Sequence, residues 1–119
     1  MANVKELLDQ AMQIDGALGV ALVDWSSGMT LGTAGGGLNL EVAGAGNTEV
    51  VRAKVKVMGS LGLKDTIEDI LITLGNQYHL IRMNEKNPTL FFYLVLDRAR
   101  SNLALARLQL SKVETQLDL

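Results

Sequence analysis

The stretch Thr89–Leu96, Thr-Leu-Phe-Phe-Tyr-Leu-Val-Leu, decides the fold more than any other part of the chain. An unbroken apolar run of this length is too short to span a membrane and is typical of a strand buried on both faces. Asp97 follows it and is a suitable N-cap residue for a helix. Apolar residues then recur at helical spacing, at Ala99, Leu103, Ala106, Leu110, Val113 and Leu117. The sequence therefore predicts a covered strand that leads directly into a long amphipathic helix.

The first third of the chain predicts a helix followed by a hairpin. Residues 4–12 place apolar side chains on one helical face, and this helix must end before Gly16. Residues 17–25 are apolar at both parities, which predicts a second strand with both faces covered. Residues 26–28, Ser-Ser-Gly, are typical of a turn, and residues 29–33 then form a short return strand.

The segment 38–62 is the hardest to assign, because its valines are compatible with either a helix or a strand. We favour a helix, since a valine-rich strand over 50–58 would leave the hairpins on both sides without a covering layer. Asn47 or Thr48 could cap this helix. An earlier start near Asn39 is the alternative, although two glycines in that extension would each cost about 1 kcal/mol relative to alanine.

The next segments predict two more strands before the covered strand of the opening stretch. Residues 66–73 alternate in polarity, Gly75-Asn76 is typical of a tight turn, and residues 78–83 form the partner strand. The predicted order is helix, strand, strand, helix, strand, strand, strand, helix, in a single domain of residues 1–119. Strands joined by short loops pair antiparallel, so we expect an α+β fold with helices on both faces of an antiparallel sheet.

Composition and charge argue against several classes of function. The net charge is −2, from 11 basic and 13 acidic residues, which argues against a nucleic-acid binder. The chain has no cysteine, so disulfides and thiolate sites are excluded. No stretch approaches the roughly 20 apolar residues of a spanning helix. The first ten residues carry Glu6 and Asp9 and lack the apolar core of a signal peptide. We therefore expect a cytoplasmic protein without membrane insertion.

No group of residues predicts catalysis, a cofactor or a metal ion. His79 is the only histidine and has no triad motif around it, so we interpret it as a structural or surface residue. Gly35–Gly37 lacks the residues that complete a phosphate-binding loop and is typical of a connector. Asp65, Glu68 and Asp69 could bind a cation, but adjacent strand positions point to opposite faces. Solvated charges on an edge strand are the better interpretation. We therefore expect a protein that is not an enzyme.

The predicted middle helix carries more apolar surface than one sheet can cover. Val51, Val55 and Met58 form one stripe, and further valines lie beside it. The excess predicts a second contact, most simply with another copy of the chain. The intervening basic residues could form a strip for an acidic partner or simply a hydrated helix face. They are Arg52, Lys54 and Lys56.

Together these features resemble the roadblock (dynein light chain roadblock) family. In the first half of the chain the matching residues are Asp15-Gly16, Gly19, the strand Val20–Asp24 and the turn residue Gly28. In the second half they are Leu90–Leu96, Asp97 and Asn102–Leu108. The resemblance covers about residues 3–112. The chain departs from the family pattern in the glycine-rich segment 35–46, where the middle helix begins.

The resemblance implies an α/β/α sandwich around a five-stranded antiparallel sheet, with a profilin-like topology. It also implies a homodimer in which the middle helix and the edge strand after it pair across a two-fold axis. The interface residues expected on this basis are Val51, Val55, Met58 and Ile70.

Roadblock proteins act without an enzymatic site, as platforms for small Ras-like GTPases or for motor complexes. This chain resembles the bacterial members, which are often paired with a Ras-like GTPase whose nucleotide cycle they regulate. The resemblance thus implies a homodimer that binds such a GTPase, without a cofactor. The candidate contacts with the partner come from the sequence itself and are the basic residues Arg52, Lys54 and Lys56. The alternative is a sensory domain that holds a small ligand between sheet and helix, as in PAS-like and profilin-like domains. Its inward polar candidates are Tyr78, His79 and Tyr93.

Overall fold

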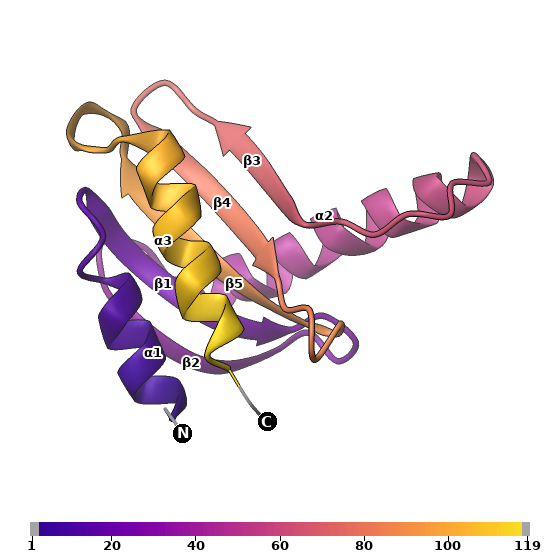
Figure 1. Ribbon diagram of the computed structural model, residues 1–119, viewed down its shortest axis with the longest axis horizontal. Coiled ribbons are helices and arrows are strands. Elements are labelled where there is room, and N and C mark those ends of the chain that lie inside the picture. Colours follow the sequence, from indigo (N-terminus) through magenta and orange to yellow (C-terminus); the bar gives the residue numbers. More distant parts are fainter. Residues whose placement is uncertain (1–2, 118–119) are drawn as a thin grey trace.

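The computed structural model describes residues 3–117, which form one antiparallel sheet with helices on both faces (Figure 1). The five strands lie in the order β2-β1-β5-β4-β3. The elements are α1 (Val4–Ala11), β1 (Ala17–Asp24), β2 (Met29–Gly35), α2 (Leu40–Ser60), β3 (Asp69–Thr73), β4 (Gln77–Met83), β5 (Leu90–Asp97), the 3₁₀ helix η1 (Arg98–Arg100) and α3 (Leu103–Thr115). The α/β/α sandwich predicted from the sequence is confirmed.

Strand β5 lies at the centre of the sheet, as its unbroken apolar sequence predicted. All its residues except Asp97 are buried. Alternate side chains enter two separate cores, because successive residues of a strand point to opposite faces. The core under α1 and α3 receives Leu90, Phe92, Leu94 and Leu96. The core under α2 receives Phe91, Tyr93 and Val95.

Helices α1 and α3 lie side by side on one face of the sheet (Figure 1). The Asn3 side chain caps α1 by accepting a hydrogen bond of 2.9 Å from the backbone N–H of Glu6. The buried face of α1 then carries the apolar residues predicted from its periodicity. The side-chain amides of Gln10 and Gln116 bond to each other at 3.0 and 3.3 Å and tie the two helices together.

Helix α2 covers the opposite face and begins at Leu40, so the early start is correct and a cap at Asn47 or Thr48 is wrong. Asn39 is the N-cap and accepts a hydrogen bond of 3.1 Å from the backbone N–H of Val42. Gly44, one of the two glycines that disfavoured this start, has a packing role. A Cβ atom at Gly44 would lie 2.7 Å from Thr30 Oγ1 and 3.0 Å from Val23 Cγ2. Only glycine lets α2 approach β1 and β2 this closely.

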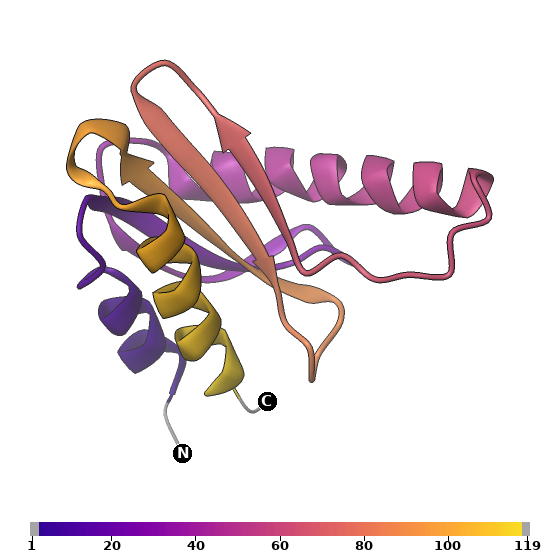
Figure 2. The ribbon, with the colours of Figure 1, turned by 45° about the horizontal axis from the view of Figure 1, so that its top comes forward.

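The second half of α2 extends past the sheet, as Figures 1 and 2 show from two directions. Its last buried residue is Val51, although the helix continues to Ser60. Residues 61–68 then return to the sheet without regular secondary structure. The predicted strand over 66–73 therefore begins only at Asp69, where pairing with β4 starts.

The junction after β5 also differs from the prediction of one continuous helix. Asp97 caps the short helix η1, and Ser101 then adopts an extended conformation. Asn102 caps α3 and accepts a hydrogen bond of 3.0 Å from the backbone N–H of Leu105. The Ser101 hydroxyl donates to the Asp97 carbonyl at 2.6 Å, which holds the chain in this two-step turn. As a result Ala99 is not part of the buried stripe of α3.

Candidate interaction surface on α2

The outward face of α2 carries an apolar stripe that the protomer leaves uncovered. Its members are small or aliphatic and recur every three or four residues, which keeps them on one helical face. They are Val42, Gly46, Val50, Ala53, Val57 and Leu61, and we call this set the α2 stripe. Val42 is 67% exposed, Val57 48% and Leu61 66%. Large apolar side chains exposed in one continuous row are typical of a protein–protein contact.

The interface residues expected from the sequence occupy different environments. Val51 is fully buried against the sheet of its own protomer, so it is left out of the interface proposed below. Val55 is 41% exposed, because it lies where α2 has passed the edge of the sheet. Met58 and Ile70 are partly buried. The predicted stripe therefore lies on the side of α2 that faces the sheet, and the valines predicted beside it belong to the outward stripe.

A cleft of about 800 Å³ separates α2 from the segment that leads into β3. Val50, Lys54 and Met58 line it from the helix, and Ile67 and Ile70 line it from the other side. Within the described residues 3–117, strand β3 is an edge of the sheet and pairs with β4 alone. The exposed helix face, the cleft and the free strand edge are therefore adjacent.

The three basic residues of α2 do not form one strip. Arg52 Nε donates to the Trp25 carbonyl and Nη2 donates to the Ser26 carbonyl, both at 3.1 Å. This holds Arg52 on the side of the β1–β2 turn. Lys54 lines the cleft near β3, on another side of the helix. Lys56 is exposed and lies about 40° around the helix from Arg52.

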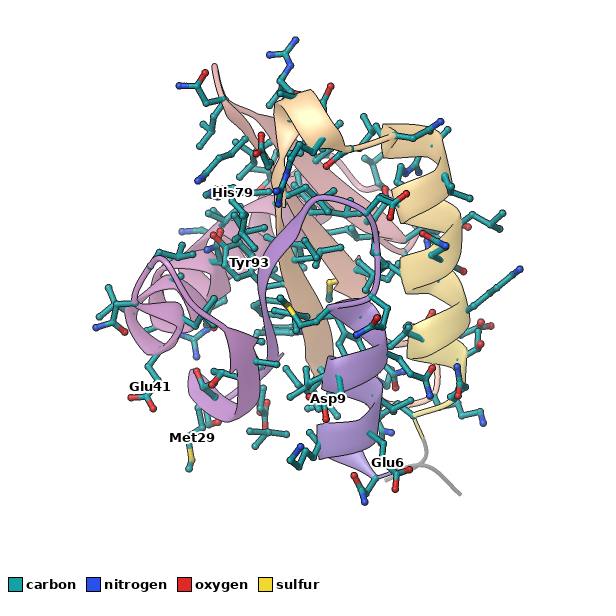
Figure 3. The ribbon with its side chains drawn as sticks, turned by 90° about the vertical axis from the view of Figure 1, so that its left-hand side faces the viewer. Glu6, Asp9, Met29, Glu41, His79 and Tyr93 are labelled. Carbon is teal, nitrogen blue, oxygen red and sulfur yellow. The ribbon has the colours of Figure 1, made fainter. Side chains whose placement is uncertain are left out.

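A polar pair lies between the sheet and α2, as Figure 3 shows. The Tyr93 hydroxyl is 2.9 Å from His79 Nδ1, and His79 Nε2 is 2.8 Å from Gln77 Oε1. Because the Gln77 oxygen can only accept, Nε2 carries the ring proton and Nδ1 accepts from tyrosine. Burial lowers the pKa of His79 and raises the pKa of Tyr93. A side-chain hydrogen bond with Asn47 lowers the pKa of Tyr93 and so partly offsets this rise. The histidine is thus structural, as its sequence context indicated.

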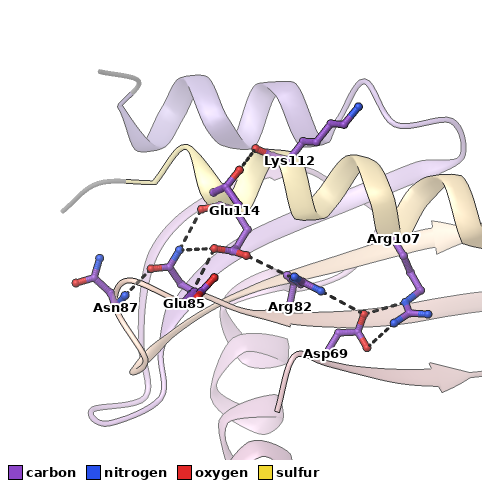
Figure 4. A network of polar contacts seen from close by, with 9 residues as sticks. Asp69, Arg82, Glu85, Asn87, Arg107, Lys112 and Glu114 are labelled. Atoms are coloured by element: carbon purple, nitrogen blue, oxygen red, sulfur yellow. Dashed lines mark hydrogen bonds and ion pairs between the residues drawn. The ribbon is translucent and has the colours of Figure 1, made fainter. Parts of the chain in front are cut away.

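A chain of ion pairs joins α3 to the edge of the sheet (Figure 4). Asp69 accepts two hydrogen bonds from Arg107, at 2.8 and 3.1 Å, and lies 3.7 Å from Arg82. Arg82 in turn lies 3.5 Å from the buried carboxylate of Glu114. That carboxylate also accepts from the Asn84 side chain at 3.0 Å. Asp69 is therefore a partly buried anchor for α3, and the prediction of a solvated edge charge was wrong for this residue.

Two further features are absent from residues 3–117. Within this part of the chain, no three histidine, aspartate or glutamate side chains gather in a way that could hold a metal ion. None of the helices described has both the length and the apolar character needed to cross a membrane.

Solved structures share this architecture over nearly the whole chain. MglB of Myxococcus xanthus is 16% identical with a TM-score of 0.80, covering 96% of this chain and 87% of that one. A roadblock/LC7 domain from Streptomyces avermitilis is 9% identical with a TM-score of 0.82, covering 97% and 94%. A structure of MglB with a tetrameric arrangement is 15% identical with a TM-score of 0.80, covering 98% and 90%.

No protein-family model matches the sequence, and no match was found among curated proteins. The structural neighbours described above are roadblock/LC7 domain proteins that cover most of the chain, which confirms the resemblance at the level of the fold. The chain has the roadblock/LC7 fold.

Proposed function

We propose that this protein is a non-enzymatic homodimer that binds a small Ras-like GTPase and regulates its nucleotide cycle. The observation that carries the proposal is the α2 stripe, exposed beside the free edge of β3. The likeness to MglB and to a roadblock/LC7 domain supports it. The proposal retains the cytoplasmic location and the single domain expected from the sequence.

The α2 stripe is complementary to itself when two copies run antiparallel. With a two-fold axis between positions 51 and 52, Gly46 faces Val57 of the second copy and Val50 faces Ala53. Each small residue then lies opposite a larger one, which permits close helix packing. Glu49 also comes opposite Lys54 of the second copy, so charges of opposite sign meet beside the apolar contact.

The second half of α2 supplies a further contact in this arrangement. If the β3 edges pair across the same axis, the sheet of the second copy continues beneath the part of α2 that extends past its own sheet. Val55 and Met58 would then be covered by the second copy, and Ile70 would lie near the joined edges. These three residues remain in the proposed interface, and the α2 stripe replaces Val51.

The GTPase contact is assigned to the surface formed by the paired α2 helices. Of the three basic residues, Lys56 is exposed and forms no ion pair within residues 3–117. Arg52 is held by the β1–β2 turn and by Glu49 at 2.7 Å, and Lys54 lies in the proposed dimer contact. We therefore propose Lys56 as the main basic contact. A regulator of this kind acts through different affinities for the nucleotide states of its partner.

A sensory domain with a ligand between sheet and helix is less well supported. Neither of the two clefts beside α2 is lined by His79 or Tyr93. Their polar atoms already bond to each other and to Gln77. The polar groups of His79 and Tyr93 are therefore occupied.

The test is light scattering coupled to size exclusion, alone and with candidate Ras-like GTPases loaded with GDP or a GTP analogue. We expect a dimer that changes elution with one nucleotide state.

Val57→Glu should give a monomer, because it places a charge in an apolar contact. Leu108→Glu is the matched control, since Leu108 is 53% exposed on α3. A monomeric wild type, or a Val57→Glu dimer, would exclude the α2 interface. A dimer that ignores every loaded GTPase would exclude the GTPase partner.

A further inference from the structure

Strand β2 forms the edge of the sheet opposite β3, and in the described part of the chain, residues 3–117, its one neighbouring strand is β1. If two copies join through β3, β2 is still the outermost strand at each end of the extended sheet. Natural proteins protect such edges with charged residues or proline, because unpaired backbone groups can accept a further strand. Residues Met29–Gly35 include neither. This edge is therefore open to an extended segment of another chain.

The register between β1 and β2 determines which backbone groups of this edge are free. The Gly36 N–H donates to the Leu18 carbonyl at 3.1 Å, which marks these two residues as a hydrogen-bonded pair. Such pairs alternate along an antiparallel ladder, and the same register continues to Gly32 opposite Leu22. The residues between the hydrogen-bonded positions direct their N–H and C=O away from β1. Thr33 therefore presents both of its backbone groups to the outside.

Two large apolar side chains of β2 remain exposed, Met29 at 63% and Leu31 at 43%. Leu31 has no partner on β1, because the register shifts between Leu22 and Val23. A bulge of this kind at a sheet edge turns a side chain in a new direction. The edge thus offers apolar contacts as well as free backbone groups to an added strand.

The end of the molecule that carries β2 is strongly acidic. Residues 1–50 include α1, β1, β2 and the first half of α2, and they hold six acidic residues and one basic residue, a formal net charge of −5. Figure 3 shows Glu6 and Asp9 on α1 and Glu41 on α2, the two helices that pack on β2. Four of the six acids form no ion pair within residues 3–117, namely Glu6, Asp15, Asp24 and Glu41. A segment that adds to this edge therefore meets negative charge on both sides.

We propose that the β2 edge binds an extended basic segment of a protein partner, which adds to the sheet as a sixth strand. Backbone hydrogen bonds to Thr33 supply the pairing, and apolar side chains of the segment cover Met29 and Leu31. Its lysine or arginine side chains lie near the acidic residues of α1 and α2. A second copy of the chain is a poorer occupant, because two ends of the same negative charge repel each other. This assignment rests neither on the α2 dimer nor on GTPase binding.

The probe is the blocked peptide acetyl-Lys-Val-Thr-Val-Thr-Val-Lys-amide, titrated into the full nitrogen-15-labelled protein and followed by NMR. We expect saturable shifts of the β2 amide signals and slower hydrogen exchange of the Thr33 N–H, because the added strand takes up this outward group. In the control peptide glutamate replaces both lysines, which reverses the charge and keeps the rest of the strand. It should bind at least about tenfold more weakly. Raising the salt concentration should weaken binding of the lysine peptide.

Thr33→Pro tests the pairing from the side of the protein. Proline removes the outward N–H and is tolerated in an edge strand at such a position. This variant should lose saturable binding of the lysine peptide, whereas Thr33→Val, which keeps the N–H, should bind as the wild type does. Urea unfolding checks that both variants are folded. Independently of these variants, the lysine peptide with proline at its central position should not bind the wild type.

Glu6→Gln and Glu41→Gln should each weaken binding of the lysine peptide by about two- to fivefold, the size of an exposed charge contact. Glu85→Gln, an exposed acid in the loop between β4 and β5, should leave binding unchanged. Equal binding of the lysine and glutamate peptides, unchanged binding by Thr33→Pro, or no saturable response at millimolar concentration would overturn the proposal. A Thr33 N–H already protected in the free protein, together with a mass above that of a dimer, would also overturn it, since a second copy would then occupy the edge.

Discussion

The close approach of α2 to the sheet predicts that Gly44→Ala destabilises the protein, although alanine favours helices. Removing a glycine from a helix interior should add about 1 kcal/mol of stability. However, the new Cβ would lie 2.7 Å from Thr30 Oγ1 and 3.0 Å from Val23 Cγ2. Val23 is fully buried and β-branched, so its side chain has few alternative rotamers. Overpacking of this kind costs about 1–3 kcal/mol.

We therefore expect the overpacking to outweigh the helix propensity and to lower the free energy of unfolding by up to about 2 kcal/mol. The assay is urea unfolding, followed by circular dichroism and by Trp25 fluorescence at one protein concentration, because dimer formation is linked to stability. Gly59→Ala is the matched control in the same helix, since nothing lies within 4 Å of its Cβ position. This variant should be neutral or more stable by up to about 1 kcal/mol. A Gly44→Ala protein as stable as Gly59→Ala would refute the packing role of this glycine.

Three further predictions concern side chains outside α2. Burial lowers the folded-state pKa of His79 below its ordinary value of 6.5, so the unfolded chain binds more protons between the two pKa values. The free energy of unfolding should therefore fall as the pH drops through that window. NMR titration of the only histidine should give a pKa below 6.5. Tyr93→Phe should raise this pKa, because it removes the hydroxyl that donates to the neutral ring. Asn102→Ala removes the cap of α3 and should cost about 1 kcal/mol in urea unfolding, whereas no loss would contradict the capping role. A double-mutant cycle with Asp69→Ala and Arg107→Ala should give a coupling of about 1 kcal/mol, and additive effects would show that the pair contributes nothing.

The strands and layers followed from the sequence because their signals are local and strong. Residues 90–96 and 17–24 are apolar at both parities, which has few explanations other than a strand covered on both faces. The turn residues at 26–28 and 75–76 then set the hairpins and the antiparallel pairing. The strand ends beside these two turns therefore needed little information from distant parts of the chain, whereas the far end of β3 is set by its pairing with β4.

The start of α2 was harder to predict, because a glycine that disfavours a helix locally is required by a tertiary contact. The clash that Gly44 avoids involves Thr30 and Val23, which are far from it in sequence. Intrinsic propensity was thus overridden by packing against the sheet. Asn39, with an apolar residue after it, was the available signal for the earlier start.

The candidate site was only partly predictable for the same reason. The spacing of Val42, Gly46, Val50, Ala53 and Val57 is visible in the sequence, but it forms one stripe only if the helix begins before residue 42. The anchoring of Asp69 by Arg107 joins residues 38 positions apart, and no local pattern indicates it. The cleft between α2 and the segment that leads into β3 likewise depends on parts of the chain that only the fold brings together.

Disulfide trapping between copies of the chain tests the proposed α2 dimer most directly. Because the chain has no native cysteine, a disulfide can form only at the introduced one. In the antiparallel arrangement, the two copies of position 53 are displaced by only about 4.5 Å along the helix axes, and those of position 42 by about 28 Å. A disulfide requires Cα atoms within about 7 Å. Ala53→Cys should therefore form a covalent dimer under mild oxidation, and Val42→Cys should remain monomeric on a denaturing gel. Cross-linking of both variants would indicate parallel helices, and failure of Ala53→Cys to cross-link would contradict the proposed α2 dimer.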